Sequence, residues 1–264
     1  MVEESDWKTE EISREPERHC GQTAHKVAVV TGASRGIGEG IARVLAAEGY
    51  HLALCCEKNG SLLDALADGL LKAYGTAVLT AVGDVADPAF ARQLKSMVDE
   101  RFGHTDVLVN NAGISHIGLL CDMSEEEWER VISVNLSSCF YMARAFVPDM
   151  VRRQSGHLIQ ISSIWGSRGA SCEVAYSAAK GGMEAFTKAL AKELAPSHVA
   201  VNAISCGVID TEMNAVFSEE ERQALVEEIP MDRFGTPEEV GRCVAALLSM
   251  PYVTGQVLGV DGGY

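Results

Sequence analysis

Residues 26–48 read KVAVVTGASRGIGEGIARVLAAE and decide the fold. The Val-rich run at 27–30 is typical of a buried parallel strand. It leads into a turn containing Gly32, Gly36 and Gly38, and a helical pattern follows. Glycines let the backbone approach a phosphate closely, and the start of the helix offers free N–H groups. The stretch therefore predicts a nucleotide-binding strand, turn and helix, although a plain turn would use the same glycines.

The same alternation continues to the C-terminus. Further strands are expected at 51–56, 77–82, 106–109, 157–161, 198–204 and 256–260. Helices are expected at 62–73, 87–103, 173–194 and after the capping residues Ser124, Ser218 and Thr236. Strands that alternate with helices predict a Rossmann-type doubly wound α/β domain of about seven parallel strands with helices on both faces. Its ligand crevice should lie at the carboxyl ends of the strands.

Composition indicates one globular domain, at residues 26–264. The chain has 264 residues, of which 47% are hydrophobic and 22% charged. Its net charge of -15 argues against nucleic-acid binding, and no apolar run has the length of a membrane helix. Residues 1–25 are acidic and poor in apolar side chains, which predicts a disordered tail without the pattern of a secretory signal.

The cysteines and histidines favour a cytoplasmic protein without a metal. The eight cysteines include no C-x-x-C pair, which indicates reduced thiols in a chain of this size. The seven histidines show no H-E-x-x-H pattern and no other obvious ligand spacing. We therefore expect no metal site.

Three side chains near residues 157–180 form a candidate catalytic group. The strand at 157–161 delivers Ser163 to its end, and the next helix carries Tyr176 and Lys180 one turn apart on one face. A nearby ammonium favours the phenolate form of a tyrosine, so the pair is a candidate acid and base. Ser163 can hydrogen-bond an oxygen whose charge changes. The alternative is that Tyr176 is simply a core residue on an alanine-rich helix.

Other polar residues follow the ends of expected strands. Asp84 ends the third strand and is either an adenine ligand or a turn former. The stretch 110–113, Asn-Asn-Ala-Gly, ends the fourth strand and either leaves room for a cofactor or is a turn. Asn135 lies in the middle of an expected long helix, where an asparagine is disfavoured unless it has polar partners.

Together these features resemble the short-chain dehydrogenase/reductase family over residues 26–264. The motifs that carry the likeness are Thr31-Gly32-x-x-x-Gly36-x-Gly38, Asn110-Asn111-Ala112-Gly113, Asn135, Ser163 and Tyr176-x-x-x-Lys180. The resemblance makes Tyr176 the proton donor and Ser163 the group that polarises the carbonyl. It implies that Lys180 binds the nicotinamide ribose and lowers the pKa of Tyr176. It also implies that Asn135 holds a water molecule that continues the proton relay.

The resemblance also implies a nicotinamide cofactor. Its contacts are expected at Gly32, Ser34, Arg35, Gly36, Ile37, Gly38, Cys56, Asp84, Val85, Asn111, Ala112, Gly113, Tyr176, Lys180, Gly207, Ile209 and Thr211. Family members usually have Pro-Gly where this chain has Cys206-Gly207, so the loop lacks one φ constraint here. A substrate lid is expected at about 207–230, and substrate contacts at Ser115, Trp165, Glu173, Met213 and Phe217.

The second strand bears on the choice of cofactor. NAD-preferring relatives end this strand with an aspartate, whereas this chain has Cys56 there and Arg35 in the glycine turn, where a guanidinium can pair with a 2′-phosphate. NADP(H) is therefore expected, and NAD(H) remains open. Glu57 is the reservation, because its carboxylate would repel the phosphate unless it is turned away or offset by Lys58.

The substrate stays open among several ketones and alcohols. The chain most resembles bacterial 3-oxoacyl-(acyl-carrier-protein) reductases, but it has Tyr141 and Ser197 where those proteins use arginines to dock the acidic carrier. It also resembles a subgroup of elongation factor P 5-aminopentanone reductases, which act on a modified protein side chain. In that case Glu173 would pair with a substrate ammonium, unless it only complements the start of its helix. A hydroxysteroid or another secondary alcohol is a further alternative.

Two expectations concern activity and assembly. A non-catalytic nucleotide-binding scaffold would most plausibly have lost Ser163, Tyr176 or Lys180, and all three are present, which favours an enzyme.

The helix at 173–194 carries small residues around more than one face, which indicates burial on both sides. The sheet covers one side, so a homotetramer is expected, as in relatives; a close helix contact within the chain is the alternative.

Overall fold

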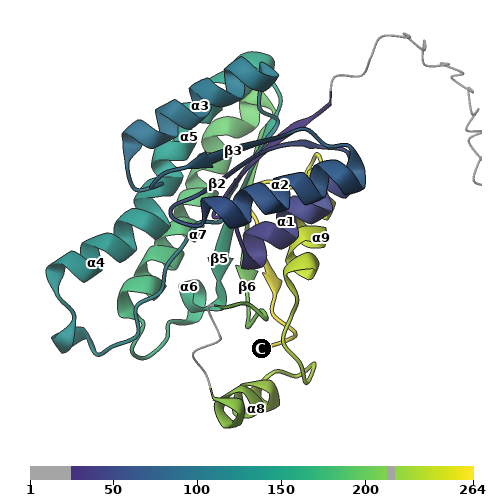
Figure 1. The fold of residues 1–264 in the computed structure, drawn as a ribbon. Helices are drawn as coiled ribbons and strands as arrows, with labels where there is room; N and C mark the ends of the chain where they lie inside the picture. The colour runs from purple at the N-terminus through teal and green to yellow at the C-terminus, as the bar shows by residue number, and fades with distance from the viewer. Residues whose placement is uncertain (1–24, 213–217) are drawn as a thin grey trace, which may run out of the picture.

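A computed structural model describes residues 25–212 and 218–264. In this part of the chain seven strands form one parallel sheet, in the order β3-β2-β1-β4-β5-β6-β7 (Figure 1). The strands are β1 Val27–Thr31, β2 His51–Cys56, β3 Val78–Val82, β4 Val107–Asn110, β5 Gly156–Ser163, β6 Val199–Cys206 and β7 Val257–Val260. The predicted doubly wound sheet is confirmed.

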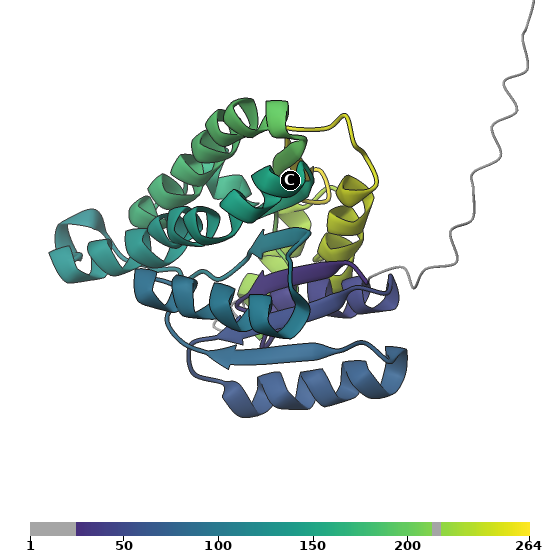
Figure 2. The same cartoon turned by 90° about the horizontal axis from the view of Figure 1, so that it is seen from above.

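Helices cover both faces of the sheet, as the view from above shows (Figure 2). One face is packed against α1 Gly36–Ala47, α2 Gly60–Tyr74 and α9 Pro237–Leu248. The other is packed against α3 Pro88–Phe102, α5 Ser138–Arg153 and α7 Val174–Leu194. The remaining described helices are η1 Leu120–Asp122, α4 Glu125–Ile132, the π-helical turn η2 Ser133–Ser137, α6 Ile164–Arg168, η3 Ala195–Ser197 and α8 Glu219–Glu228. None of the described helices is long and apolar enough to cross a bilayer.

The central strand β1 shows why the strands read as unbroken apolar runs. All five of its residues are buried, and successive side chains enter opposite cores. Ala28 and Val30 pack with the helices on the α1 side, whereas Val27 and Val29 pack with those on the α5 side. Because β1 lies between β2 and β4, the direction of strand progression reverses at β1/β4. A ligand crevice is expected at the carboxyl ends of these two strands.

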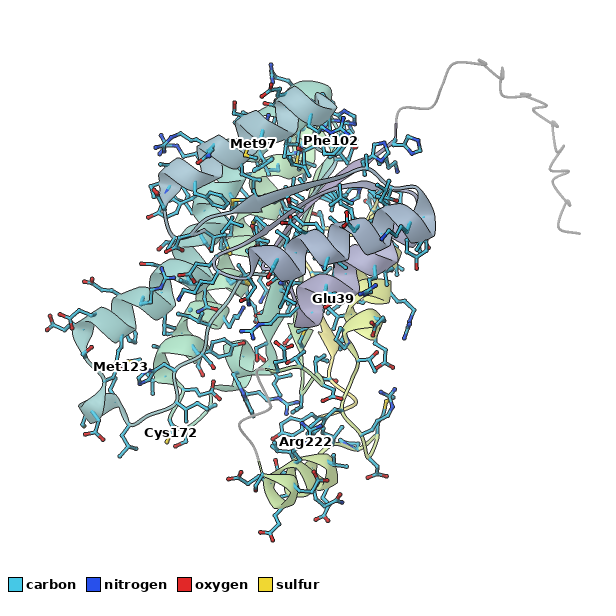
Figure 3. The ribbon with its side chains drawn as sticks, in the orientation of Figure 1. Glu39, Met97, Phe102, Met123, Cys172 and Arg222 are labelled. Carbon is cyan, nitrogen blue, oxygen red and sulfur yellow. The ribbon has the colours of Figure 1, made fainter. Side chains whose placement is uncertain are left out.

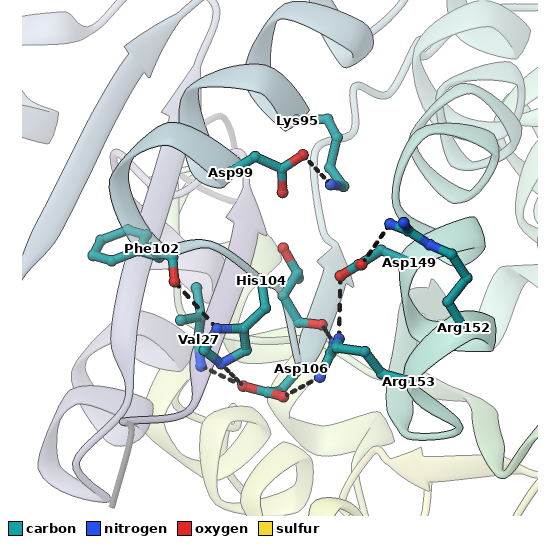
Figure 4. A network of polar contacts seen from close by, with 10 residues as sticks. Val27, Lys95, Asp99, Phe102, His104, Asp106, Asp149, Arg152 and Arg153 are labelled. Carbon is teal, nitrogen blue, oxygen red and sulfur yellow. Dashed lines mark hydrogen bonds and ion pairs between the residues drawn. The ribbon is translucent and has the colours of Figure 1, made fainter. Parts of the chain in front are cut away.

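A network of ion pairs lies at the amino ends of the central strands, opposite the expected crevice (Figure 4). The carboxylate of Asp106 accepts a hydrogen bond from the Val27 backbone N–H at 2.8 Å and lies 3.0 Å from Arg153 at the end of α5. Arg153 also lies 3.1 Å from Asp149. His104 lies 3.1 Å from the Asp106 oxygen that accepts from the Val27 N–H. The network joins α5 to the start of β1 and leaves the carboxyl ends of the strands for a site.

Two elements differ from the sequence predictions. The long helix expected after Ser124 is divided by the π-helical turn at 133–137, whose hydrophobic pattern continues that of its neighbours. The loop expected after Ser163 contains the short helix α6, in which the Ser163 hydroxyl accepts a hydrogen bond from the Trp165 N–H. The tail at 1–24 and the lid residues Met213 and Phe217 lie outside the described residues.

Candidate active site

A cavity of about 520 Å³ lies at the carboxyl ends of the strands. It extends from the glycine-rich turn after β1 to the start of α7. Most of the predicted site residues line it, namely Gly32, Ser34, Arg35, Gly36, Ile37, Cys56, Asp84, Val85, Asn111, Ala112, Gly113, Ser115, Ser163, Trp165, Glu173, Tyr176, Lys180, Gly207, Ile209 and Thr211. Among the described candidates, Gly38 and Asn135 do not line the cavity. They contact Gly32 and Ile114, which do.

The glycine-rich turn is held against the end of β4. The Asn111 amide donates hydrogen bonds to the carbonyls of Thr31 at 2.8 Å and Gly32 at 3.1 Å. The Thr31 hydroxyl accepts from the N–H groups of Asn111 and Ala112, each at 3.0 Å. Gly32 has a φ of +64°, and a Cβ at Gly38 would lie 2.4 Å from the Gly32 carbonyl oxygen. The close approach opens a backbone cradle at the start of α1 that fits a dinucleotide pyrophosphate.

Ser163 and Tyr176 meet at the other end of the cavity. Ser163 is the last residue of β5, and Tyr176 lies in the first turn of α7. Burial raises the pKa of the Tyr176 phenol above its ordinary value of 10.0, while a hydrogen bond with the Ser163 side chain acts to lower it. The phenol is therefore protonated at neutral pH, and it can donate a proton to an oxygen bound beside both hydroxyls.

Lys180 lies one turn after Tyr176 and is almost completely buried. Its ammonium donates to the Ile161 carbonyl at 2.7 Å and lies 5.5 Å from the centre of the Tyr176 ring. Burial lowers the pKa of Lys180 from its ordinary value. The lowering of the Tyr176 pKa by Lys180, which the family resemblance implies, stays a prediction.

Asn135 occupies the π-helical turn between α4 and α5. Its amide donates to the carbonyls of Ile114 at 2.8 Å and Val131 at 2.9 Å, and its side-chain oxygen accepts from the Ile114 N–H at 3.3 Å. The Asn135 backbone carbonyl accepts a hydrogen bond from the Cys139 thiol. A π-helical turn inside a helix frequently marks a functional position. Here it places a buried amide against the segment that follows β4.

The predicted nucleotide end of the cavity is bordered by several ion pairs. The Arg35 guanidinium lies 2.8 Å from the Glu212 carboxylate, in the loop after β6. On the opposite side, Arg130 of α4 lies 3.2 Å from Glu57 and 2.5 Å from Asp84. Asp84 also accepts a hydrogen bond from the Ala86 N–H at 2.9 Å, so it forms a turn as one of its two interpretations predicted.

The opposite end of the cavity is lined by Trp165 and Glu173. Glu173 precedes α7 as its N-cap but makes no capping hydrogen bond with its side chain. Burial raises the pKa of its carboxyl group. The preceding loop contains Cys172, whose carbonyl accepts from the Gly118 N–H at 2.8 Å, and Figure 3 shows Cys172 and Met123 on neighbouring loops at this end. A partly buried carboxylate thus lies three residues before the candidate proton donor.

Comparisons with known proteins agree with this geometry. A protein-family model described as Enoyl-(Acyl carrier protein) reductase matches residues 32–264. The 3-oxoacyl-(acyl-carrier-protein) reductase FabG of Escherichia coli (strain K12) is 38% identical over 241 residues, which cover 90% of this chain and 96% of that protein. The chain belongs to the short-chain dehydrogenase/reductase family. It is accordingly an NAD(P)-dependent oxidoreductase that acts on CH–OH groups.

Two further relatives cover as much of the chain. Nodulation protein G of Azospirillum brasilense is 40% identical over 242 residues, covering 91% of this chain and 98% of that protein. The uncharacterized oxidoreductase YmfI of Bacillus subtilis (strain 168) is 39% identical over 242 residues, covering 91% and 99%. The resemblance predicted from the motifs is confirmed across nearly the whole chain.

Sequence reasoning did not single out several residues of the site, although Glu212 and Leu225 lie within the segment expected to form a lid. Glu212 and Leu225 line the cavity, and Arg130 contacts two of its carboxylates. Glu212 directly follows the predicted contact Thr211, so its position was a usable signal. Arg130 had none, because it belongs to a helix far along the chain from Glu57 and Asp84. Cys206, which replaces the family proline, pairs in register with Ser163 and lines the cavity.

Proposed function

We propose that the protein is an NADPH-dependent carbonyl reductase in which Tyr176 donates the proton to the ketone oxygen. The placement of Ser163 and Tyr176 carries the proposal, because both side chains line the same cavity and Ser163 is near enough to act on the pKa of the Tyr176 phenol. A carbonyl oxygen bound there accepts from both groups. A bound nicotinamide supplies the hydride. The protein supplies alignment and electrostatic stabilisation.

Side chains of the protein stabilise the charge on the ketone oxygen, transfer the proton and replace it. As negative charge develops on the ketone oxygen, Ser163 holds it by a hydrogen bond and Tyr176 transfers its phenolic proton. Lys180 places a buried positive charge beside the Tyr176 ring, which favours the phenolate that the transfer leaves. Asn135 holds the Ile114 segment, and we assign to it the water through which the proton is replaced.

NADPH is favoured over NADH by the residues at the nucleotide end. Cys56 ends β2 where an aspartate would accept the ribose hydroxyls, and Arg35 lines the same part of the cavity. Titration of both cofactors in the same buffer tests this preference. Tighter binding of NADH than of NADPH would contradict it.

The first substrate candidate is a carrier-linked 3-oxoacyl group, by likeness to relatives named for that activity. A second candidate is a ketone that bears an amino group, including one on a modified protein side chain. Glu173 favours the second, because a partly buried carboxylate in the cavity can pair with an ammonium. Helix α8, whose Leu225 lines the cavity, carries Glu219, Glu220, Glu221, Glu227 and Glu228. An acidic border favours a cationic substrate over an acidic carrier.

An assay of NADPH oxidation with three ketones distinguishes these candidates. The panel contains an acetoacetyl thioester, an amino ketone and an oxosteroid. Glu173→Gln should lower kcat/KM for the amino ketone relative to that for a neutral ketone of the same length, because the ion pair is lost. An equal change for both ketones would remove the amino ketone from consideration. Failure to oxidise NADPH with any of the three would contradict the proposed reductase.

We also propose that the protein is a homotetramer. The outward side of α7 exposes Ala178, Ala185 and Ala189, and α5 exposes Phe140. Small side chains of this kind allow two helices to pack closely. Light scattering at micromolar concentration tests the assembly, and a monomer at that concentration would contradict it.

A further inference from the structure

Glu57 is the residue of the nucleotide end whose charge conflicts with the proposed cofactor. It directly follows the last residue of β2 and lines the cavity together with Arg35 and Lys58. An acidic residue in this region of a dinucleotide-binding fold accepts a hydrogen bond from the ribose 2′-hydroxyl of NAD. The same carboxylate repels the 2′-phosphate of NADP. Its environment therefore bears directly on cofactor preference.

Arg130 binds this carboxylate from the side of α4. One terminal nitrogen of its guanidinium lies 3.2 Å from a Glu57 oxygen, and the other lies 2.5 Å from an Asp84 oxygen. The second oxygen of Asp84 accepts from the Ala86 backbone N–H, which fixes the orientation of that carboxylate. Asp84 thus holds one terminal nitrogen of the Arg130 guanidinium in place, and the other terminal nitrogen meets Glu57.

The charges of four interacting side chains balance in this arrangement. Glu57 and Asp84 contribute two negative charges, and Arg130 and Lys58 contribute two positive charges, since Lys58 lies 3.4 Å from Glu57. The side chain of Lys58 is 80% exposed, so solvent weakens its effect, whereas that of Arg130 is only 38% exposed. Arg130 is therefore the main cation that offsets Glu57.

We propose that Arg130 determines cofactor preference by withdrawing Glu57 from the ribose site. The inference rests on the proposed NADPH-dependent function and deepens it. With its oxygen bound to Arg130, Glu57 is a poorer acceptor for the ribose 2′-hydroxyl, and its charge no longer opposes a phosphate near Arg35. Arg130 acts through Glu57, so it is a positioning residue. It belongs to α4 and not to the glycine turn that is expected to bind the cofactor.

Binding measurements on a double-mutant cycle test this role. Dissociation constants for NADPH and NADH are measured from nicotinamide fluorescence for the wild type, Arg130→Met, Glu57→Gln and the double variant. Arg130→Met should lower the preference for NADPH over NADH about tenfold, because Glu57 then keeps only the exposed Lys58 as a partner. In the Glu57→Gln background the same change should alter the preference by less than about twofold. Arg130→Lys should retain part of the preference.

Arg152→Met is the matched control. It also removes one cation from an ion pair, but that pair, with Asp149, lies at the opposite edge of the sheet (Figure 4). The preference should stay within about twofold of the wild type, because charges this far apart are screened by salt. An equal loss in this control would trace the effect to net charge and overturn the role of Arg130.

Two other results would overturn the inference while leaving the proposed function intact. One is an Arg130→Met protein with unchanged preference, or with the same loss when Glu57 is already glutamine. The other needs only the conservative variant Glu57→Gln, which should change NADH affinity by less than about twofold, since the carboxylate is already withdrawn. A larger loss of NADH affinity would show that Glu57 reads the ribose in the wild type. If the wild type binds neither cofactor, the proposed function itself fails.

Discussion

The guanidinium of Arg35 lies 2.8 Å from the carboxylate of Glu212, so the cation expected to meet a 2′-phosphate is already paired within the chain. Both side chains are more than half exposed, at 58% and 60%. Pairs of this exposure contribute little stability, and a phosphate can replace the carboxylate at small cost. Glu212 is therefore a competitor for the phosphate.

Glu212→Gln should strengthen NADPH binding by up to about fivefold, because a pair of this kind is worth about 0.2–1 kcal/mol. NADH affinity should change much less, since that cofactor lacks the phosphate. Arg35→Ala should have the opposite effect and weaken NADPH far more than NADH. Titrations at two salt concentrations provide the check, and a gain for NADH equal to that for NADPH would contradict competition at the phosphate.

Tyr176→Phe should lower kcat for ketone reduction by about 10²–10⁴-fold, the usual contribution of a positioned proton donor. NADPH affinity should change by no more than about tenfold, the worth of one neutral hydrogen bond. Steady-state kinetics and fluorescence titration measure the two effects separately. A variant with nearly normal kcat would assign the proton donor to another group.

The pKa of Tyr176 gives a prediction about pH. Burial raises it above 10.0 in the chain without cofactor, so the phenol should remain protonated from neutral pH to at least pH 10. Reduction needs this protonated form and should fall only as pH rises through the pKa that applies in the complex. The tyrosinate absorbance of the wild type minus that of Tyr176→Phe follows the group. Ionisation near pH 7 without cofactor would contradict the prediction.

Gly38→Ala should disrupt the cradle after β1. The added methyl group would lie 2.4 Å from the Gly32 carbonyl oxygen and 2.5 Å from the Asn111 amide nitrogen. Such overpacking costs about 1–3 kcal/mol, and affinity for both cofactors should fall. Gly69→Ala is the control, because its methyl group meets nothing within 4 Å on helix α2 and should stabilise the chain by up to about 1 kcal/mol. Thermal denaturation and cofactor titration compare the two, and equal behaviour would contradict the close approach.

Glu239→Gln should weaken the start of α9 and change the acid stability of the fold. The Arg233 guanidinium and the Thr236 backbone N–H lower the pKa of Glu239 from 4.5 to about 2. Its stabilising effect is full above pH 4.5 and is lost as pH falls toward 2. The variant should lose about 1 kcal/mol near neutral pH and lack this part of the acid transition. Urea unfolding between pH 2 and 7 measures both, and parallel pH curves for the two proteins would argue against it.

The sheet and most of the cavity wall could be predicted because both depend on local pattern. Val-rich runs identify β1, and a glycine turn that follows a strand identifies the cradle. The motif spacing also placed Ser163 and Tyr176 together. The ion pairs of Arg130 and Glu212 could not be predicted, because the partners lie far apart along the chain and tertiary packing brings them together. The π-helical turn at 133–137 was hidden by an apolar pattern that continues through it.

That turn has a consequence for how the enzyme tolerates changes in chain length. A π-helical turn contains about one residue more than the α-helical turn it replaces. Deleting one residue between 133 and 137 should join α4 and α5 into one regular helix, because the wide turn becomes an ordinary α-helical turn. The turn that holds the Asn135 amide against Ile114 would then be lost, even if Asn135 itself stayed in the chain. In this segment the number of residues, and not only their identity, therefore sets the position of the Asn135 amide.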